Sequence, residues 1–133
     1  LEAEGLARGQ IWLGGFSQGA CLALETFARE GEGLAGVIAL SGGLVGTADA
    51  GGPGAAELYG HAPKQFEYAG NRAGGDVWIS VHQRDPHIPL RRVEESVTVL
   101  KALGASVESR VYPGAGHGGL ADDIAAIRSR LNR

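Results

Sequence analysis

Three residues of this sequence have the side chains that a catalytic triad needs. They occur in the order Ser17, Asp85 and His117, and each follows a different short apolar run. A serine hydroxyl becomes a strong nucleophile only when a base removes its proton, and histidine titrates near neutral pH. A carboxylate fixes the tautomer of such a histidine and stabilises its charged form. These residues therefore predict nucleophilic acyl transfer.

The pattern around Ser17 is G-x-S-x-G, which reads G-F-S-Q-G over residues 15–19. The pattern is typical of a sharp turn between a strand and a helix, which exposes the serine hydroxyl at the edge of a sheet. Glycines are expected on both sides, because other side chains would collide with the turn. A helix that begins at Gln18 would direct its free N–H groups towards the place where an oxyanion forms.

Simpler interpretations stay open for each residue. A chain with 23 glycines gives this pattern easily, and Ser17 could be a helix cap in a glycine-rich turn. Asp85 could cap a turn, and His117 could be an exposed loop residue. Asp122 and Asp123 are rival carboxylates, but their position in the first turn of the last helix favours a capping role. The other histidines are residues 61, 82 and 87.

Apolar periodicity predicts the elements that would position these residues. Short buried strands are expected at residues 10–15, 36–40 and 77–81, and an alternating strand nearer an edge at residues 106–112, with Val107, Ser109 and Val111 on one face. Helical spacing covers residues 17–30 and 90–103, and a last amphipathic helix has Leu120, Ile124, Ile127 and Leu131 on its apolar face. The order predicts an α/β fold whose parallel sheet has helices on both faces.

Between Leu44 and Asp76 the periodicity fails, and we expect a long excursion with a short helix or two. Trp12 and Trp78 fall in strands and are predicted to lie in the core. Arg84, Arg91 and Arg92 could bind an acidic leaving group, but a solvated helix start is the favoured interpretation.

Composition narrows the classes of function. The chain has 133 residues with 12 basic and 15 acidic side chains, a net charge of −3, which argues against a nucleic-acid partner. One cysteine, Cys21, excludes an internal disulfide framework and a CxxC metal site. No apolar run is long enough to cross a membrane, and no secretory leader is present, so we expect a cytoplasmic protein.

Three longer segments carry a resemblance to a known family. GFSQGACLAL, GVIALSGGL and DPHIPLRRVEESVTVLKALGASVESRVYPGAGHG resemble the phospholipase/carboxylesterase family of α/β-hydrolases, which includes acyl-protein thioesterase-like enzymes. The resemblance is closest to the bacterial carboxylesterase branch, and ten arginines against two lysines also suggest a bacterial source. The order serine, acid, histidine is that of α/β-hydrolases.

The resemblance implies an α/β-hydrolase fold and a serine esterase acting on short- to medium-chain acyl esters. It implies that Ser17 is the nucleophile, Asp85 the triad acid and His117 the general base, with the backbone N–H of Gln18 as one oxyanion donor. No cofactor and no metal are implied. The partner is a small-molecule acyl ester, with no membrane span, and a homodimer stays open.

The sequence departs from the family in two places. His82-Gln83 stands where the family often has His-Gly. The family's sheet also begins well before the nucleophile, and the loop that supplies a second oxyanion donor should precede Leu1. Because the chain has no methionine and begins at Leu1, we expect residues 1–133 to be a single partial domain, roughly the last two-thirds of a hydrolase.

Other functions stay open beside the esterase. The same triad serves an acyl thioesterase or a lysophospholipase. A chain without its second oxyanion donor could instead be a non-catalytic fragment or binding module. A dienelactone hydrolase would need a cysteine at the elbow, whereas Cys21 lies four residues beyond Ser17, where a packed apolar role is expected.

Overall fold

Four parallel strands form the sheet of the computed structural model, which describes residues 1–45 and 66–132. The strands are β1 (Trp12–Phe16), β2 (Gly36–Leu40), β3 (Asp76–Arg84) and β4 (Ser106–Ala115), and they lie in the order β1-β2-β3-β4. The predicted strands are confirmed, although β3 and β4 extend further than their apolar cores. The sheet therefore brings the carboxyl ends of all four strands to one edge.

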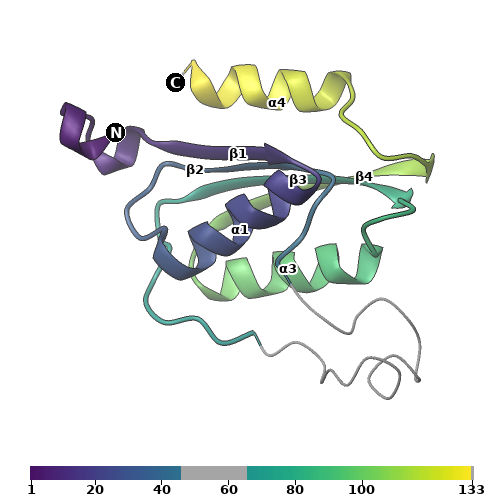
Figure 1. The fold of residues 1–133 in the computed structure, drawn as a ribbon, viewed down its shortest axis with the longest axis horizontal. Coiled ribbons are helices and arrows are strands. Elements are labelled where there is room, and N and C mark those ends of the chain that lie inside the picture. Colours follow the sequence, from purple (N-terminus) through teal and green to yellow (C-terminus); the bar gives the residue numbers. More distant parts are fainter. Residues whose placement is uncertain (46–65, 133) are drawn as a thin grey trace.

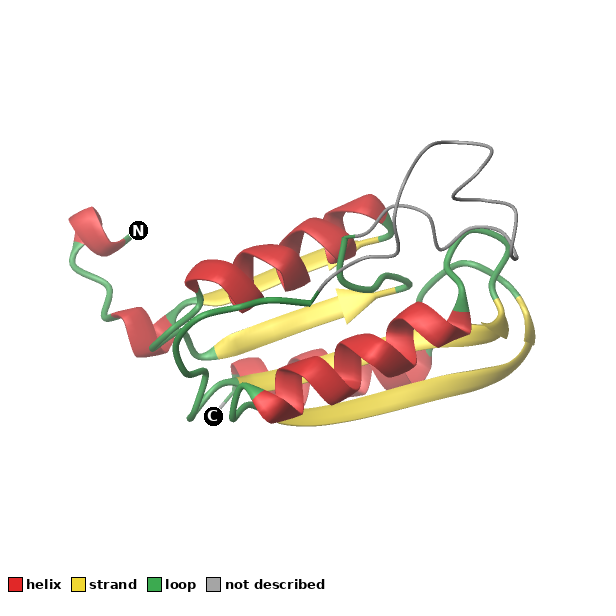
Figure 2. Ribbon diagram, turned by 90° about the horizontal axis from the view of Figure 1, so that it is seen from below, coloured by secondary structure: helices red, strands yellow, loops and turns green. Residues whose placement is uncertain are grey.

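Helices cover both faces of this sheet. α1 (Gln18–Glu30) and α3 (Leu90–Ala102) lie on one face, and α4 (Ala121–Leu131) lies on the other (Figures 1 and 2). Two short 3-10 helices, Glu2–Glu4 and Arg8–Gln10, precede β1. This is the predicted α/β order, and no helix among the described residues is long and apolar enough to cross a bilayer.

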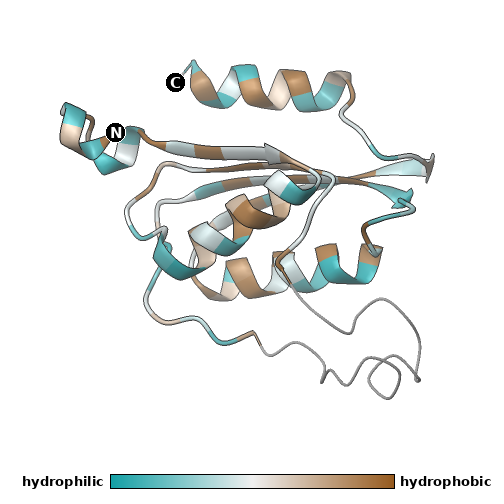
Figure 3. Cartoon of the chain, viewed as in Figure 1, coloured by the Kyte–Doolittle hydropathy of each residue, from teal (hydrophilic) through white to brown (hydrophobic). Residues whose placement is uncertain are grey.

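The larger core lies between the sheet and the pair α1 and α3. Leu24, Phe27, Ile79 and Leu100 are fully buried there, and α1, α3 and the strands all carry brown hydrophobic segments in Figure 3. The smaller cluster on the α4 face is built around Trp78, which is 2% exposed, with Trp12 packed against its edge. Trp78 therefore lies in the core, as predicted, whereas Trp12 is only partly buried.

The predicted apolar face of the last helix is wrong except at Ile127, which packs against the Trp78 cluster. Leu120, Ile124 and Leu131 are about half exposed, whereas Asp123, Ala126 and Arg130 face the sheet. Polar partners on the sheet explain this rotation, since Trp78 donates its indole N–H to Asp123 and the Arg130 guanidinium pairs with Asp76 and Glu108. Helix α4 is thus attached by polar contacts as much as by apolar burial.

The alternation predicted for residues 106–112 is also only partly right. Val107 packs against the larger core, but Val111 is 43% exposed and Tyr112 is buried instead. β4 is the last strand of the described sheet, and near its carboxyl end the Tyr112 ring packs on His82. Val111 and Tyr112 point to opposite faces of the sheet, and Tyr112 is covered by His82 on the α4 face.

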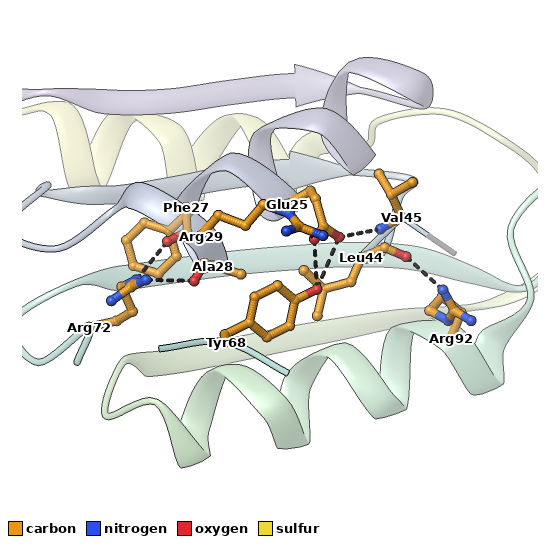
Figure 4. Close-up of polar contacts among 9 residues, drawn as sticks. All are labelled: Glu25, Phe27, Ala28, Arg29, Leu44, Val45, Tyr68, Arg72 and Arg92. Carbon is orange, nitrogen blue, oxygen red and sulfur yellow. Dashed lines mark hydrogen bonds and ion pairs between the residues drawn. The ribbon is translucent and has the colours of Figure 1, made fainter. Parts of the chain in front are cut away.

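The described ends of the long excursion are attached to α1 and α3 (Figure 4). Glu25 accepts hydrogen bonds from the Val45 N–H and the Tyr68 hydroxyl, and Arg72 donates to the carbonyls of Phe27 and Ala28 at the end of α1. In the described parts of this excursion, residues 44–45 and 66–75, no helix occurs, and the rest of it, with His61, lies outside the described residues.

Arg92 corrects the expectation of a solvated helix start. Its guanidinium is buried, donates to the carbonyl of Leu44 at 3.0 Å and lies over the Phe66 ring. The reason is its position on the inward face of α3, one turn before buried Ser96, which itself accepts a bond from the Leu44 N–H. Arg91 is exposed as expected and pairs with Glu95.

Candidate active site

Ser17 lies between the end of β1 and the start of α1, in a strained backbone conformation. Its φ is 56° and its ψ is −118°, and only one other described residue that is not glycine has a positive φ. The Ser17 N–H donates to the carbonyl of Leu40 at the end of β2, and the Ser17 carbonyl accepts from Cys21 in α1. The predicted strained turn is therefore present, and the neighbouring strand and the helix hold it in place.

Gly15 and Gly19, the two glycines of the G-x-S-x-G pattern, have different surroundings. A Cβ atom at Gly15 would lie 2.3 Å from the backbone of Gly19, a distance that backbone atoms cannot tolerate. A Cβ atom at Gly19 would meet nothing within 4 Å, so the expectation of a collision at this position is wrong. A second close approach occurs at Gly42, whose Cβ atom would lie 2.6 Å from that of Ala20 and 3.0 Å from the Ser17 carbonyl oxygen.

The structure brings Ser17, His117 and Asp85 together in one chain of hydrogen bonds. The Nε2 atom of His117 lies 2.7 Å from the Oγ atom of Ser17, and its Nδ1 atom lies 2.7 Å from Oδ2 of Asp85. The side chain of Asp85 is fully buried and that of His117 is 18% exposed. A base that contacts the hydroxyl and an acid that orients the base is the arrangement that serine nucleophiles need.

Asp85 is fixed by the turn in which it lies. Its second oxygen, Oδ1, accepts hydrogen bonds from the backbone N–H groups of His87 and Ile88, at 2.7 and 3.0 Å. Burial alone would raise the pKa of Asp85, but the hydrogen bonds from His117 and these N–H groups outweigh it and hold the pKa below its ordinary value. The carboxyl group therefore stays ionised beside the imidazole.

The segment that carries His117 packs on His82. A Cβ atom at Gly116 would lie 2.9 Å from the His82 ring, and that ring contacts Tyr112 at a centroid distance of 5.4 Å. Gly114 has a φ of 86°, a conformation that other residues rarely adopt. His82 is thus a support beneath the His117 loop, a role that its sequence position two residues before the end of β3 did not indicate.

Two rings that the sequence did not single out contact His117. Phe16 lies on it with a centroid distance of 5.1 Å, and His87 lies edge-on at 4.8 Å. Both side chains are exposed. Phe16 directly precedes Ser17 and His87 follows Asp85 by two residues, so their closeness in sequence to the triad residues was the available signal.

The start of α1 is positioned as an anion site requires. α1 begins at Gln18, immediately after Ser17, so the Gln18 N–H is one of the first groups of the helix without an acceptor within it. The positive end of the helix dipole lies at the same place. These features suit the oxyanion role expected for the backbone of Gln18.

The rival carboxylates serve α4 instead. Asp123 accepts hydrogen bonds from the Leu120 N–H and from Trp78, and Asp122 pairs with Arg110. Their expected position at the start of the last helix is confirmed. Within the described part of the chain, no three His, Cys, Asp or Glu side chains gather as a set of metal ligands.

The parallel sheet, the strained serine turn and the order serine, acid, histidine define an α/β-hydrolase fold. Comparisons with known proteins agree with this class. The model of the family described as Phospholipase/Carboxylesterase matches residues 2–51. The crystal structure of a phospholipase/carboxylesterase from Dyadobacter fermentans is 37% identical with a TM-score of 0.79, over 99% of this chain and 56% of that one.

A curated relative, acyl-protein thioesterase 1 of Gibberella zeae, is 27% identical over 98% of this chain and 50% of its own length. The carboxylesterase of Bacillus cereus, at 18% identity and a TM-score of 0.70 over 98% of this chain and 53% of that one, shares the fold. In sequence and structure the chain therefore resembles the phospholipase/carboxylesterase family of α/β-hydrolases. It spans about half the length of these relatives.

Proposed function

We propose that this chain carries the catalytic triad of a serine carboxylesterase that hydrolyses short- to medium-chain carboxylic acyl esters. The observation that carries the proposal is the continuous hydrogen-bonded chain from Ser17 through His117 to Asp85. The family relationship supports the ester class of substrate, since relatives are named as carboxylesterases. As part of this proposal, the enzyme is cytoplasmic, and it hydrolyses a small-molecule ester without a cofactor.

Acylation begins with attack of the Ser17 Oγ atom on the ester carbonyl carbon. The Nε2 atom of His117 takes the hydroxyl proton as the new C–O bond forms. The tetrahedral oxyanion lies against the N–H of Gln18 at the start of α1. When the intermediate collapses, the bond to the alcohol oxygen breaks, and His117 gives the proton to the departing alcohol.

Deacylation repeats these steps with water in place of serine. His117 takes a proton from water as the water oxygen attacks the acyl carbon. When the bond between that carbon and the Ser17 oxygen breaks, His117 gives the proton to the Ser17 oxygen. Asp85 remains a carboxylate throughout, because its pKa is held below the ordinary value. Its negative charge stabilises the imidazolium form of His117.

The proposal assigns one oxyanion donor, the N–H of Gln18, to the described residues, and α/β-hydrolases use a second N–H from another loop. In serine hydrolases, removal of one such donor lowers kcat by about 10²–10³-fold. We therefore propose full activity for the natural full-length protein. A non-catalytic role is the alternative for a chain whose second donor is missing.

A thioester substrate is the second candidate, because a curated relative is an acyl-protein thioesterase. Lysophospholipids are a third. All three reactions use the same proton transfers between Ser17 and His117.

The test compares the natural full-length protein with its Ser17→Ala variant on p-nitrophenyl esters of increasing acyl length. The proposal predicts turnover that the substitution lowers by a factor on the order of 10⁴ or more. Equal turnover by the two proteins would remove Ser17 from the reaction. A parallel series of acyl thioesters ranks the two substrate classes by kcat/KM.

A further inference from the structure

The loop between β4 and α4, residues 116–120, carries His117 and ends in a contact with Asp123 (Figure 1). The backbone N–H of Leu120 donates to the Oδ2 atom of Asp123 at 2.8 Å, and the Leu120 carbonyl accepts the Asp123 N–H at 3.0 Å. A Cβ atom at Gly119 would lie 3.6 Å from the same carboxylate oxygen. The Asp123 side chain therefore lies directly against the end of the loop, three residues after the base.

The other oxygen of Asp123 is bound to the sheet. Its Oδ1 atom accepts the indole N–H of Trp78, on β3, at 2.9 Å. Trp78 is 2% exposed, and the guanidinium groups of Arg110 and Arg130 lie over its ring at 5.5 and 5.2 Å from the centroid. Asp123 therefore joins the loop to an indole ring that its neighbours hold in place.

Strand β3 supports both ends of this loop. Trp78 and His82 lie four residues apart on β3, so their side chains point to the same face of the sheet. On that face His82 lies under the start of the loop, and Trp78 binds Asp123 at its end. Asp85 follows directly after the same strand. One strand thus sets the positions of the loop and of the acid that His117 must meet.

Both partners of the Asp123 side chain are donors, and each of its oxygens accepts one N–H. The side chain is 1% exposed, so bulk water does not replace a lost partner. An amide at this position has a single acceptor oxygen, and its NH₂ group would face the N–H of Leu120 or of Trp78. The neighbouring Asp122 differs, because it is exposed and pairs with Arg110 on the surface.

We propose that Asp123, bound to Trp78, is a positioning residue for His117. Its contact with the loop keeps the Nε2 atom of His117 within hydrogen-bond distance of the Ser17 hydroxyl, a separation of 2.7 Å in the structure. The proposal rests on the proposed function, and Asp123 itself touches no reacting atom. A displacement of about 1 Å in a catalytic group can lower the rate on the order of 10²-fold. Release of the loop at Leu120 is therefore enough to slow catalysis.

The first test measures kcat and KM on a p-nitrophenyl ester for the natural full-length protein, Asp123→Asn and Asp122→Asn. In either orientation of its amide, asparagine at position 123 breaks one of the two bonds that join the loop to the sheet. We expect kcat to fall at least about tenfold with KM nearly unchanged. Asp122→Asn is the matched control, since it removes the same charge from the same turn of α4, and it should keep the natural kcat. Equal kcat in the two variants would overturn the proposal.

A second position in α4 separates positioning from stability. Ala126 is buried in the middle of the helix and lies outside the loop, so Ala126→Gly loosens α4 without removing a contact of the loop. Urea unfolding should show a loss of stability in Ala126→Gly, while its kcat, measured where circular dichroism shows the variant folded, stays natural. A fall in kcat that follows the loss of stability in both Ala126→Gly and Asp123→Asn would reduce Asp123 to a structural role and overturn the proposal.

Hydrogen exchange tests the contact without any use of activity. In Asp123→Ala both acceptor oxygens are gone, so the peptide that contains Leu120 should exchange its amide protons faster than in the natural full-length protein, whereas Asp122→Ala should leave it unchanged. Faster exchange in a protein that hydrolyses no ester would contradict the esterase and support the hold of Asp123 on the loop. An active enzyme with natural exchange and natural kcat in the Asp123 variants would retain the esterase and overturn the role of Asp123.

Discussion

The Oγ atom of Ser17 and the Nε2 atom of His117 lie 2.7 Å apart although 100 residues separate them in the sequence. Ser17 follows β1 at one side of the described sheet, and His117 follows β4 at the other. Loops from the ends of both strands converge over β2 and β3, where Asp85 meets them. The contact therefore depends on a parallel sheet that ends all four strands at one edge.

Replacement of Asp85 by asparagine should lower activity without unfolding the protein. Asparagine nearly preserves the shape of the side chain, but it removes the charge that favours the imidazolium and allows the wrong tautomer of His117. We expect kcat to fall by a factor on the order of 10⁴, measured on a p-nitrophenyl ester. A loss smaller than tenfold, with an unchanged circular dichroism spectrum, would show that another group orients His117.

The stability of the protein should depend on Asp85 at acid pH. Because the folded state holds the pKa of Asp85 below its ordinary value, its contribution to the free energy of unfolding is complete above the unfolded pKa of about 3.9. The contribution is lost as pH falls from there through the lower folded pKa. Urea unfolding of the natural protein and Asp85→Asn, from about pH 6 down to pH 2, measures this difference.

The difference in the free energy of unfolding between the natural protein and Asp85→Asn should shrink as the pH falls. A constant difference over the whole range would mean that the carboxyl group of Asp85 titrates alike in the folded and unfolded chains.

Alanine should have opposite effects at the two glycines that flank Ser17. At Gly15 the added methyl group would lie 2.3 Å from the Gly19 backbone, so we expect a loss of about 3 kcal/mol or more in the free energy of unfolding. At Gly19, inside α1 and in open space, alanine should gain roughly 0.5–1 kcal/mol. Chemical denaturation measures the free energy of unfolding of both variants. Similar losses of stability at the two positions would contradict the geometry of the turn.

The His117 loop should be sensitive to alanine at Gly116 only while His82 is present. The new methyl group would lie 2.9 Å from the His82 ring and push the loop away from Ser17, so kcat/KM should fall about tenfold or more. The same change in a His82→Ala background should cost much less, because the obstructing ring is gone. A double-mutant cycle on ester hydrolysis measures the coupling, and additive losses would mean that His82 does not support the loop.

Sequence patterns could predict the strands, because parallel strands buried on both faces are short apolar runs. Residues 36–40 are the clearest case, since the predicted and observed bounds of β2 coincide. The positions of Ser17, Asp85 and His117 relative to one another followed from the rule that parallel strands end at one edge.

The remaining features depend on partners that lie far away in the sequence. The inward face of α4 is set by Asp123 and Arg130, whose partners lie on β3 and β4, so helical periodicity alone selected the wrong face. The burial of Arg92 depends on Leu44, 48 residues earlier. The contact between His87 and His117 likewise needs the geometry of two loops, which no local pattern contains.

The central claim is that Ser17 is a nucleophile activated by His117. Treatment of the natural full-length protein with a fluorophosphonate, followed by peptide mass spectrometry, measures this directly, because the reagent phosphonylates only an activated serine. We expect one adduct, on the peptide that contains Ser17, and its loss in His117→Gln. No adduct on active enzyme, or an adduct on a different serine, would contradict it.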